Sequence, residues 1–182
     1  MKKMTQMEYD ALPIIAGRRQ CPSITNYSGI TDFGEWASFG EWASFGEWAS
    51  FGKGASFGKG ARFGKGARFG EGASFGEGAS FGKGASFGEG ARFGEGASFE
   101  GGHKAKLGYP LFSCGGIGSR HGTTYAFNCK DGIIIRCGCF VGTIDKFRVC
   151  VCKVYGENGH GKIYLGFANM AEEQFRITTS KE

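Results

Sequence analysis

The stretch from Phe33 to Ser50 reads FGEWAS-FGEWAS-FGEWAS, and nine more six-residue units follow it without a spacer. They continue as FGKGAS, FGKGAR, FGKGAR, FGEGAS, FGEGAS, FGKGAS, FGEGAR, FGEGAS and a degraded FEGGHK. A short strict period is typical of a solenoid, because one unit cannot bury its apolar residue until neighbouring units stack on it. The repeat therefore predicts the shape of the middle of the chain.

Each unit is expected to contribute one short strand and one corner. The Ala at the fifth position and the Phe that opens the next unit lie two residues apart, so on a strand both point inward, while the Ser or Arg between them faces solvent. Glycine follows each intact Phe and also takes the fourth position from Gly54 onward. We expect both glycines to provide the bend. Three units then make a triangular coil, and twelve units make about four coils.

The charges support stacking at an interval of three units. This interval places Glu35 next to Lys53 and Lys53 next to Glu71, so that opposite charges meet between coils. Tandem duplication of a single unit also produces such triplets, and this interpretation stays open. A disordered Phe-Gly segment and a Gly-rich linker have similar compositions, although the strict placement of Phe and Ala argues against both.

The unit resembles the hexapeptide pattern of left-handed parallel β-helices, best known from bacterial acyltransferases, with Phe in place of the usual aliphatic residue. The resemblance implies a left-handed coil, whereas the general rule for parallel crossovers favours the right hand. We therefore expect a mainly β chain. A left-handed parallel β-helix of about four triangular coils over residues 31–102 would be followed by a small α+β module over residues 103–182.

Residues 1–30 are expected to form an N-terminal cap, because a parallel coil leaves an open edge that must be covered. Tyr27 lies one repeat length before the first intact unit, which indicates a worn unit ahead of it. Trp36, Trp42 and Trp48 occupy the fourth position of the first three units only. We favour packing of these side chains beneath the N-terminal segment. The alternative is an aromatic collar that binds a partner.

The C-terminal module has the pattern of an α+β fold. Its predicted strands are Leu111–Cys114, Thr123–Cys129 and Ile133–Cys139, with a hairpin turn at Lys130-Asp131-Gly132, and its predicted helices are Thr143–Tyr155 and Lys162–Phe175, separated by Gly156–Gly161. In the first helix, Thr143 is a suitable N-cap, and Ile144, Phe147, Val151 and Val154 have helical spacing. The β-branched run over residues 149–154 leaves a strand as the alternative.

The segment GGIGSRHG, residues 115–122, is the first candidate for chemistry in this module. Glycines allow backbone amides to approach an anion, and Arg and His add donors, although a flexible turn explains the same residues. The candidate ligand-binding residues are Ser119, Arg120, His121, Arg136 and Lys146.

Seven cysteines include two Cys-x-Cys pairs, Cys137 with Cys139 and Cys150 with Cys152. Four thiolates can hold zinc, but two residues separated by one position on a helix diverge by about 160°. We therefore expect reduced thiols, no metal and no cofactor. None of the three histidines stands in a recognised catalytic arrangement, so no catalytic residue is assigned.

The segments IGSR, TTYAF, DGI and GCFVGTIDKF, with FGEG-type units upstream, resemble the C-terminal modules of small uncharacterised phage and prophage proteins. The resemblance implies a non-catalytic binding protein of a phage or mobile element. Its β-helix scaffold would present the C-terminal module to a host protein or a small anionic ligand, in counteraction of host defence. The alternatives are a coenzyme A-dependent acyltransferase of the hexapeptide type and a structural or virion assembly protein.

The composition sets further expectations about partners and location. A net charge of +5 spread over both signs is too mild to indicate nucleic-acid binding, and no apolar stretch is long enough to cross a membrane. Lys2 and Lys3 precede no apolar run, so we expect no signal peptide and a location in the host cytoplasm. We also expect a homo-oligomer, with a trimer favoured.

Overall fold

The computed structural model describes residues 1–99, 102–106, 111–119 and 121–179. The chain forms two compact units, Met1–Leu107 and Gly108–Glu182, which we call the solenoid unit and the C-terminal unit. The predicted candidate Arg120 lies outside the described residues.

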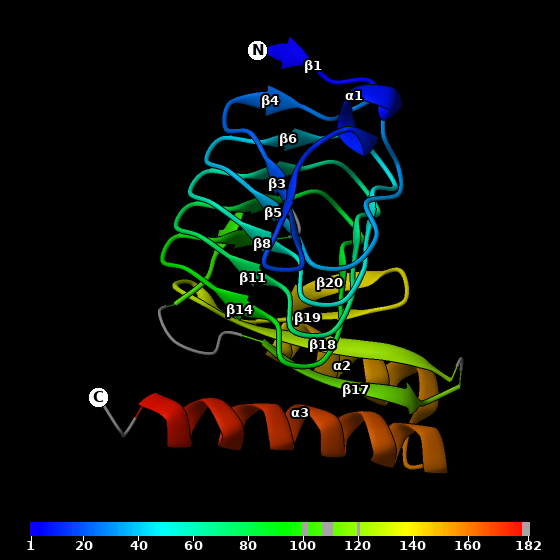
Figure 1. Cartoon of the computed structure of the whole chain (residues 1–182). Helices are drawn as coiled ribbons and strands as arrows, with labels where there is room; N and C mark the ends of the chain where they lie inside the picture. Colours follow the sequence, from blue (N-terminus) through cyan, green and yellow to red (C-terminus); the bar gives the residue numbers. More distant parts are fainter. Residues whose placement is uncertain (100–101, 107–110, 120, 180–182) are drawn as a thin grey trace. The chain divides into compact units, whose positions relative to one another are not determined.

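The solenoid unit is a β-solenoid of about four turns, as the repeat predicts, and Figure 1 shows its coils stacked one on another. Each strand pairs a Ser or Arg with the following Phe, and only the first strand is longer by one residue. The strands are β5 (Ala37–Phe39), β6 (Ser44–Phe45), β7 (Ser50–Phe51), β8 (Ser56–Phe57), β9 (Arg62–Phe63), β10 (Arg68–Phe69), β11 (Ser74–Phe75), β12 (Ser80–Phe81), β13 (Ser86–Phe87), β14 (Arg92–Phe93) and β15 (Ser98–Phe99). They belong to three sheets in which these strands run parallel, so each sheet is one wall of the coil.

The register confirms a coil of three units. Arg68 pairs with Ser50 on one side and with Ser86 on the other, which places Phe69 between Phe51 and Phe87. Rings stacked in this way have centroids 4.7–5.3 Å apart with interplanar angles of 3–12°. Neighbouring columns meet edge to face, and all twelve repeat phenylalanines are only 1–6 % exposed. Both arrangements are favourable for aromatic pairs, so the core consists of three interlocked Phe columns.

The two glycines of the repeat have different roles, and the prediction that both provide the bend was wrong for one of them. The fourth-position glycines have positive φ, +68° at Gly54 and +67° at Gly72, and form the corner. At Gly70, a second-position glycine, an added Cβ would lie 2.7 Å from the backbone of Gly52 and Lys53 in the preceding coil. Fourth-position glycines therefore turn the chain, and second-position glycines from Gly40 to Gly94 allow adjacent coils to approach closely, whereas Gly34 in the first unit has φ +62° and no such neighbour.

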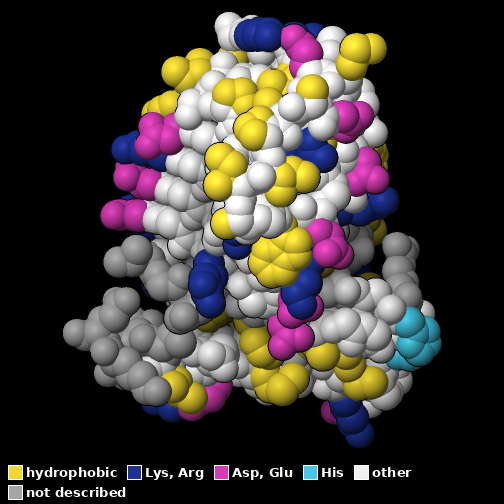
Figure 2. All heavy atoms as spheres, viewed as in Figure 1, with side chains coloured by type: hydrophobic (Ala, Val, Ile, Leu, Met, Phe, Trp, Pro, Cys, Tyr) yellow, Lys and Arg dark blue, Asp and Glu magenta, His cyan; other side chains and the backbone are white. Residues whose placement is uncertain are grey.

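Charges on the solenoid surface pair between the second and third coils, which confirms the expectation for Lys53 with Glu71 but not for Glu35 with Lys53. Lys53 lies 3.2 Å from Glu71, and Lys59 lies 3.1 Å from Glu77. Figure 2 shows basic and acidic side chains along the edges of the solenoid. All four side chains are about half exposed, so each pair contributes at most about 1 kcal/mol to stability.

The N-terminal region adds a partial coil and a lid to the solenoid. Its elements are β1 (Lys2–Lys3), α1 (Gln6–Asp10), β2 (Ile14–Ile15), β3 (Arg18–Cys21) and β4 (Thr25–Asn26). Cys21 pairs in register with Phe39, and the Tyr27 ring stacks on Phe45 at 5.1 Å, so the worn unit predicted at Tyr27 is confirmed and another precedes it. From α1, Tyr9 packs edge-on against Phe33 at 5.3 Å and donates a 2.5 Å hydrogen bond to the Phe33 carbonyl oxygen.

The last described coil is closed by an antiparallel strand. The strand β16 (His103–Lys104) pairs with β15, with His103 opposite Phe99. An antiparallel neighbour ends the parallel stacking on that wall.

The C-terminal unit is a four-stranded antiparallel sheet followed by two helices. The elements are β17 (Leu111–Ile117), β18 (Gly122–Cys129), β19 (Gly132–Cys137), β20 (Phe140–Thr143), α2 (Ile144–Tyr155) and α3 (Gly159–Thr179), and the strands pair in chain order. Both helices pack on the sheet around a core that includes Ala126, Ile135, Phe147 and Phe167. The two helices, the turn at Lys130-Asp131-Gly132 and the N-cap Thr143 are as predicted, and the strand alternative for residues 149–154 was wrong.

Three predicted boundaries in the C-terminal unit were wrong. The segment 115–122 is not all loop, because β17 continues to Ile117. The third strand ends at Cys137, and Gly138 (φ +59°) with Cys139 forms a two-residue turn into β20, which was not predicted. The second helix begins at Gly159 rather than Lys162, because the Asn158 side chain accepts a 2.9 Å hydrogen bond from the Gly161 amide and so caps the helix.

Candidate functional site

The C-terminal unit contains a pocket of about 150 Å³, to which the β19–β20 hairpin and both helices contribute. Its lining consists of Ser119, Cys137, Cys139, Phe140, Phe147, Cys150, Val151, Val154, Tyr155 and Tyr164. Because three of these ten side chains are cysteines, we call it the thiol pocket.

The floor of the thiol pocket is apolar and buried. Phe147 and Val151 on α2 are each 3 % exposed, and Tyr164 on α3 is 4 % exposed. The Phe140 ring lies 5.3 Å from Phe147, which fixes the start of β20 against α2. Val154 follows Phe147 by seven residues and is 62 % exposed, so this helix face runs from the buried floor to the solvent.

Hydroxyl groups gather at one side of the pocket. Ser119 Oγ lies 2.7 Å from Tyr155 Oη, and the Ser119 amide donates a 3.2 Å hydrogen bond to Tyr164 Oη. Burial raises the pKa of the Tyr164 hydroxyl, so this group stays protonated at neutral pH. The preceding residue, Gly118, has φ +72°, and an added Cβ there would overlap the Tyr164 ring, so glycine is required for this close approach.

The thiols differ in exposure. Cys137 is half-buried, and its Sγ accepts a 3.3 Å hydrogen bond from Thr124 Oγ1. Cys139, at the hairpin tip, and Cys150, on α2, are exposed and stand on the rim. The predicted divergence of the second Cys-x-Cys pair is confirmed, because Cys150 lines the pocket and Cys152 does not.

The chemistry of the lining suits a neutral ligand. No Asp, Glu, Lys, Arg or His belongs to the lining within the part of the chain that the structure describes. An apolar cavity of about 150 Å³ can accommodate a single aromatic ring. The Ser119 and Tyr155 hydroxyls can exchange hydrogen bonds with a polar substituent on such a ring.

Of the predicted ligand-binding residues, Ser119 lines this pocket and the other described ones do not. His121 is exposed in the turn before β18, and Lys146 is exposed in the first turn of α2. The Arg136 guanidinium lies 4.3 Å from the centre of the Tyr125 ring. Arg136 lies one residue from both Ile135 and Cys137, whose side chains pack on the helix-covered core, so it faces the opposite side of β19.

The three tryptophans of the first coil are partly exposed, at 40, 43 and 54 % for Trp36, Trp42 and Trp48. Each has positive φ, and each indole covers the glycine at the corner of the following coil, where an added Cβ would overlap it. The favoured packing beneath the N-terminal segment is found at Trp36, where Arg18 lies 5.3 Å from the ring centroid. Trp48 instead has Lys65 of the following coil over its ring at 5.8 Å.

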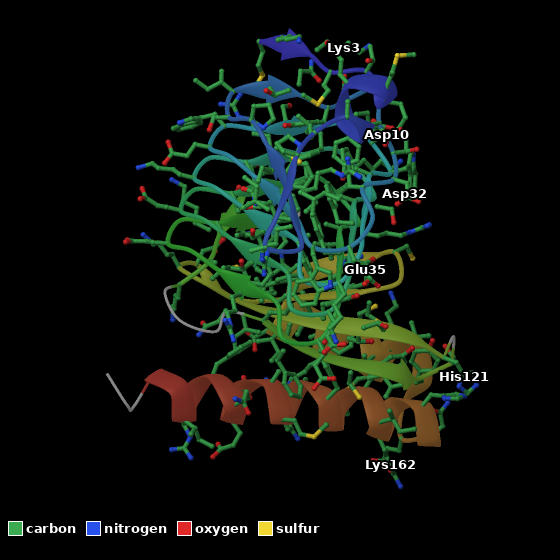
Figure 3. All side chains as sticks on the ribbon, viewed as in Figure 1. Lys3, Asp10, Asp32, Glu35, His121 and Lys162 are labelled. Atoms are coloured by element: carbon green, nitrogen blue, oxygen red, sulfur yellow. The ribbon has the colours of Figure 1, made fainter. Side chains whose placement is uncertain are left out.

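A second, wider cleft of about 500 Å³ lies in the solenoid unit beside α1. Asp10, Asp32 and Glu35 line it, and Figure 3 shows them along one side of the first coils. Arg19 stands in the same cleft and donates hydrogen bonds of 2.8 and 2.7 Å to the carbonyl oxygens of Tyr9 and Asp10. These two hydrogen bonds from Arg19 hold α1 in place.

Within the described ranges, no group of three or more His, Cys, Asp or Glu side chains is placed to hold a metal ion. None of the described helices has the length and apolar character needed to cross a membrane. Comparison with known proteins gave no match to a family model, a curated protein or a solved structure.

Proposed function

We propose that the chain is a binding protein whose thiol pocket takes a small, neutral, aromatic ligand with one polar substituent. The observation that carries this proposal is the lining itself: a buried aromatic floor, a pair of hydroxyls and no charged side chain among the described residues. A neutral ligand replaces the anion expected from the sequence, because burying an unpaired anion in such a pocket is costly.

The biological setting of this proposal is a phage or mobile element, and its support is the resemblance of the C-terminal segments to phage and prophage proteins. The β-solenoid serves as a rigid scaffold, and sequestration of a host ligand is how such a protein would counteract host defence. The exposed rings of Trp36, Trp42 and Trp48 are candidate anchors for a host protein, since partly exposed aromatic residues are common in interfaces.

The ligand class is tested with phenol and benzoate, which differ little in size and differ in charge at pH 7. We expect saturable binding of phenol, with a Kd between about 10 μM and 1 mM, as NMR shift changes in Val151 and Tyr155. Benzoate should bind at least about tenfold more weakly, because none of the described lining residues carries a positive charge.

A matched pair of variants localises the binding. Cys150→Phe places a ring in the pocket and should abolish phenol binding, whereas Cys152→Phe, two residues away on the same helix and outside the lining, should leave it unchanged. Tighter binding of benzoate than of phenol, or equal binding by the two variants, would contradict the proposal.

The oligomer and the partners are tested together by native mass spectrometry of the protein purified from a phage-infected host. We expect a homo-oligomer, with a trimer favoured, and a retained small molecule of one-ring size. A host protein captured by the parent chain and lost in Trp42→Ala would identify the tryptophans as anchors.

The acyltransferase alternative is favoured by one observation, the coil of six-residue units, with His103 in the strand that ends it. It predicts steady release of free thiol from acetyl-coenzyme A in the presence of amine acceptors, and loss of this release in His103→Ala. A chain that releases no thiol under these conditions is not such an enzyme.

A further inference from the structure

We propose that Cys139 and Cys150 form an oxidation site, in which a hydroperoxide converts the two thiols into a disulfide across the rim of the thiol pocket. Nothing in the binding function requires this pair. The inference about the disulfide stands on the arrangement of the cysteines alone, and its consequence for ligand binding rests on the proposed function.

Two separate elements bring the thiols to one place. Cys139 is the second residue of the tight turn between β19 and β20, and Cys150 projects from the α2 face that also carries Phe147 and Val151 into the pocket. The contact between Phe140 and Phe147, 5.3 Å between ring centres, ties the residue after Cys139 to the helical turn before Cys150. Because one helical turn rises only about 5.4 Å, Cys139 and Cys150 both lie near this contact between the hairpin and α2.

Both cysteines line the same pocket of about 150 Å³. A disulfide needs Cβ atoms about 3.5–4.5 Å apart, so the hairpin tip must bring Cys139 to within this distance of Cys150. The tip is a two-residue turn with an exposed Gly138, which makes it the part of the hairpin that moves most easily.

The other two nearby cysteines are poor partners. Cys137 accepts the hydrogen bond from Thr124 and lies beside the Tyr164 hydroxyl, and its separation from Cys139 by one residue would give a strained ring. Cys152 is also exposed but projects from another face of α2, outside the pocket. The structure therefore selects one pair among four cysteines.

The reaction balances with a hydroperoxide as the oxidant. The thiolate of one cysteine attacks the outer peroxide oxygen, which gives a sulfenic acid and releases an alcohol, or water from hydrogen peroxide. The second thiol attacks the sulfenic sulfur and displaces water, and the disulfide forms. Both thiols are exposed, so the oxidant reaches them.

The disulfide would obstruct the pocket. Phe147, Val151 and Tyr164 form the buried floor, whereas Cys139 and Cys150 stand on the exposed rim. Joining the rim residues places two sulfur atoms over the entrance, and a ring-sized ligand could then enter only after reduction.

The test uses the full chain treated with hydrogen peroxide, followed by alkylation of the remaining thiols and peptide mass spectrometry. We expect a cross-link between the peptide that begins at Cys137 and the peptide that carries Cys150, with a loss of about 2 Da that dithiothreitol reverses. Cys139→Ser and Cys150→Ser should abolish the cross-link, and Cys137→Ser and Cys152→Ser should preserve it. A cross-link that persists in Cys150→Ser, or thiols that oxidise singly to sulfinic acids without cross-linking, would overturn the assignment.

Phenol binding separates this inference from the proposed function. If both hold, oxidation of the parent chain weakens phenol binding at least about tenfold, dithiothreitol restores it, and Cys139→Ser is insensitive to peroxide. A cross-link in a chain that never binds phenol would overturn the proposed ligand and leave the oxidation site standing. Unchanged phenol binding in the cross-linked chain would overturn the closure of the pocket.

Discussion

Replacing Gly70 by alanine tests the close approach of coils, and Gly72→Ala is its control. Both glycines belong to the same unit in the middle of the solenoid. At Gly70, the new Cβ would lie 2.7 Å from the backbone carbon of Gly52 and from the amide nitrogen of Lys53. At Gly72, φ is +67°, but no atom lies within 4 Å of the new Cβ. One substitution therefore forces two coils apart, and the other only strains a corner.

The magnitudes differ enough to be measured. Ordinary contact requires about 3.4 Å, so the coils at Gly70 must separate locally, which stretches the 2.8 Å hydrogen bond from the Gly70 amide to the Phe51 carbonyl. Overpacking costs about 1–3 kcal/mol, and a weakened hydrogen bond costs about 0.5–1.5 kcal/mol. Alanine also has less conformational entropy than glycine in the unfolded chain, which stabilises the fold by about 0.4–1 kcal/mol. The net loss in the free energy of unfolding is therefore about 0.5–4 kcal/mol, with a central value of about 2 kcal/mol.

Gly72→Ala should cost less. A left-handed backbone conformation costs an L-residue about 1–2 kcal/mol, and the same gain of about 0.4–1 kcal/mol from the unfolded chain leaves a net loss of about 0–1.5 kcal/mol, with a central value of about 0.8 kcal/mol. Urea unfolding of both variants, followed by circular dichroism, measures the difference. A loss in Gly72→Ala equal to or greater than that in Gly70→Ala would refute the roles assigned to the two glycines.

Three further predictions concern the solenoid unit. Phe69→Ala removes the ring between Phe51 and Phe87 and should lower the free energy of unfolding by about 3–5 kcal/mol, whereas Ser74→Ala on the outer surface should change it by less than about 0.5 kcal/mol, as measured by urea unfolding. Gly54→Ala should destabilise the chain because its Cβ would overlap the Trp36 indole. Adding Trp36→Gly to this variant should restore part of the lost Tm, so a double variant whose Tm change is the sum of the two single changes would contradict the contact. Burial raises the pKa of the Cys21 thiol from 9.0 to about 12, so the folded chain keeps a proton that the unfolded chain releases. Stability should therefore be full below about pH 9 and fall as the pH rises toward 12, and Cys21→Ala but not the exposed Cys152→Ala should reduce this fall in unfolding measured at pH 8–11.

The repeat itself predicted the core well, because a strand has only two faces and one of them is always Phe and Ala. The function of the glycines could not be separated in the same way. Positive φ at Gly72 and close backbone approach at Gly70 both disfavour a side chain, so from Gly52 to Gly96 both positions carry glycine in every unit. The corner at Trp36 could not be predicted from the residue type, since a bulky residue rarely has positive φ.

The N-terminal coil was only half visible in the sequence. Tyr27 resembles the repeat, whereas Cys21 takes the place of Phe and Thr25 that of Ala, and both are buried. Ile24, with φ +50°, stands where the repeat has Trp or Gly. Register with the following coil, rather than residue type, identifies this unit.

The thiol pocket was beyond the sequence because its lining comes from positions distant along the chain. Ser119 was a candidate for other reasons, but its contacts with Tyr155 and Tyr164 depend on how both helices pack on the sheet. The nearest signal in the sequence was the helical spacing of Phe147, Val151 and Val154, which predicts an apolar helix face. The structure shows that this face is not fully covered, because Val154 is exposed.

Hydrogen exchange of the repeat amides tests the stacked coils most directly. Amides at the second, fourth and sixth positions donate to a neighbouring coil, as at Gly70 to Phe51, Gly72 to Glu89 and Ser74 to Ala55. We expect these three amides to exchange at least about a thousandfold more slowly than in an unstructured peptide, and the same positions to be protected in every interior unit. Exchange across residues 51–98 at the rate of an unstructured chain would contradict the solenoid.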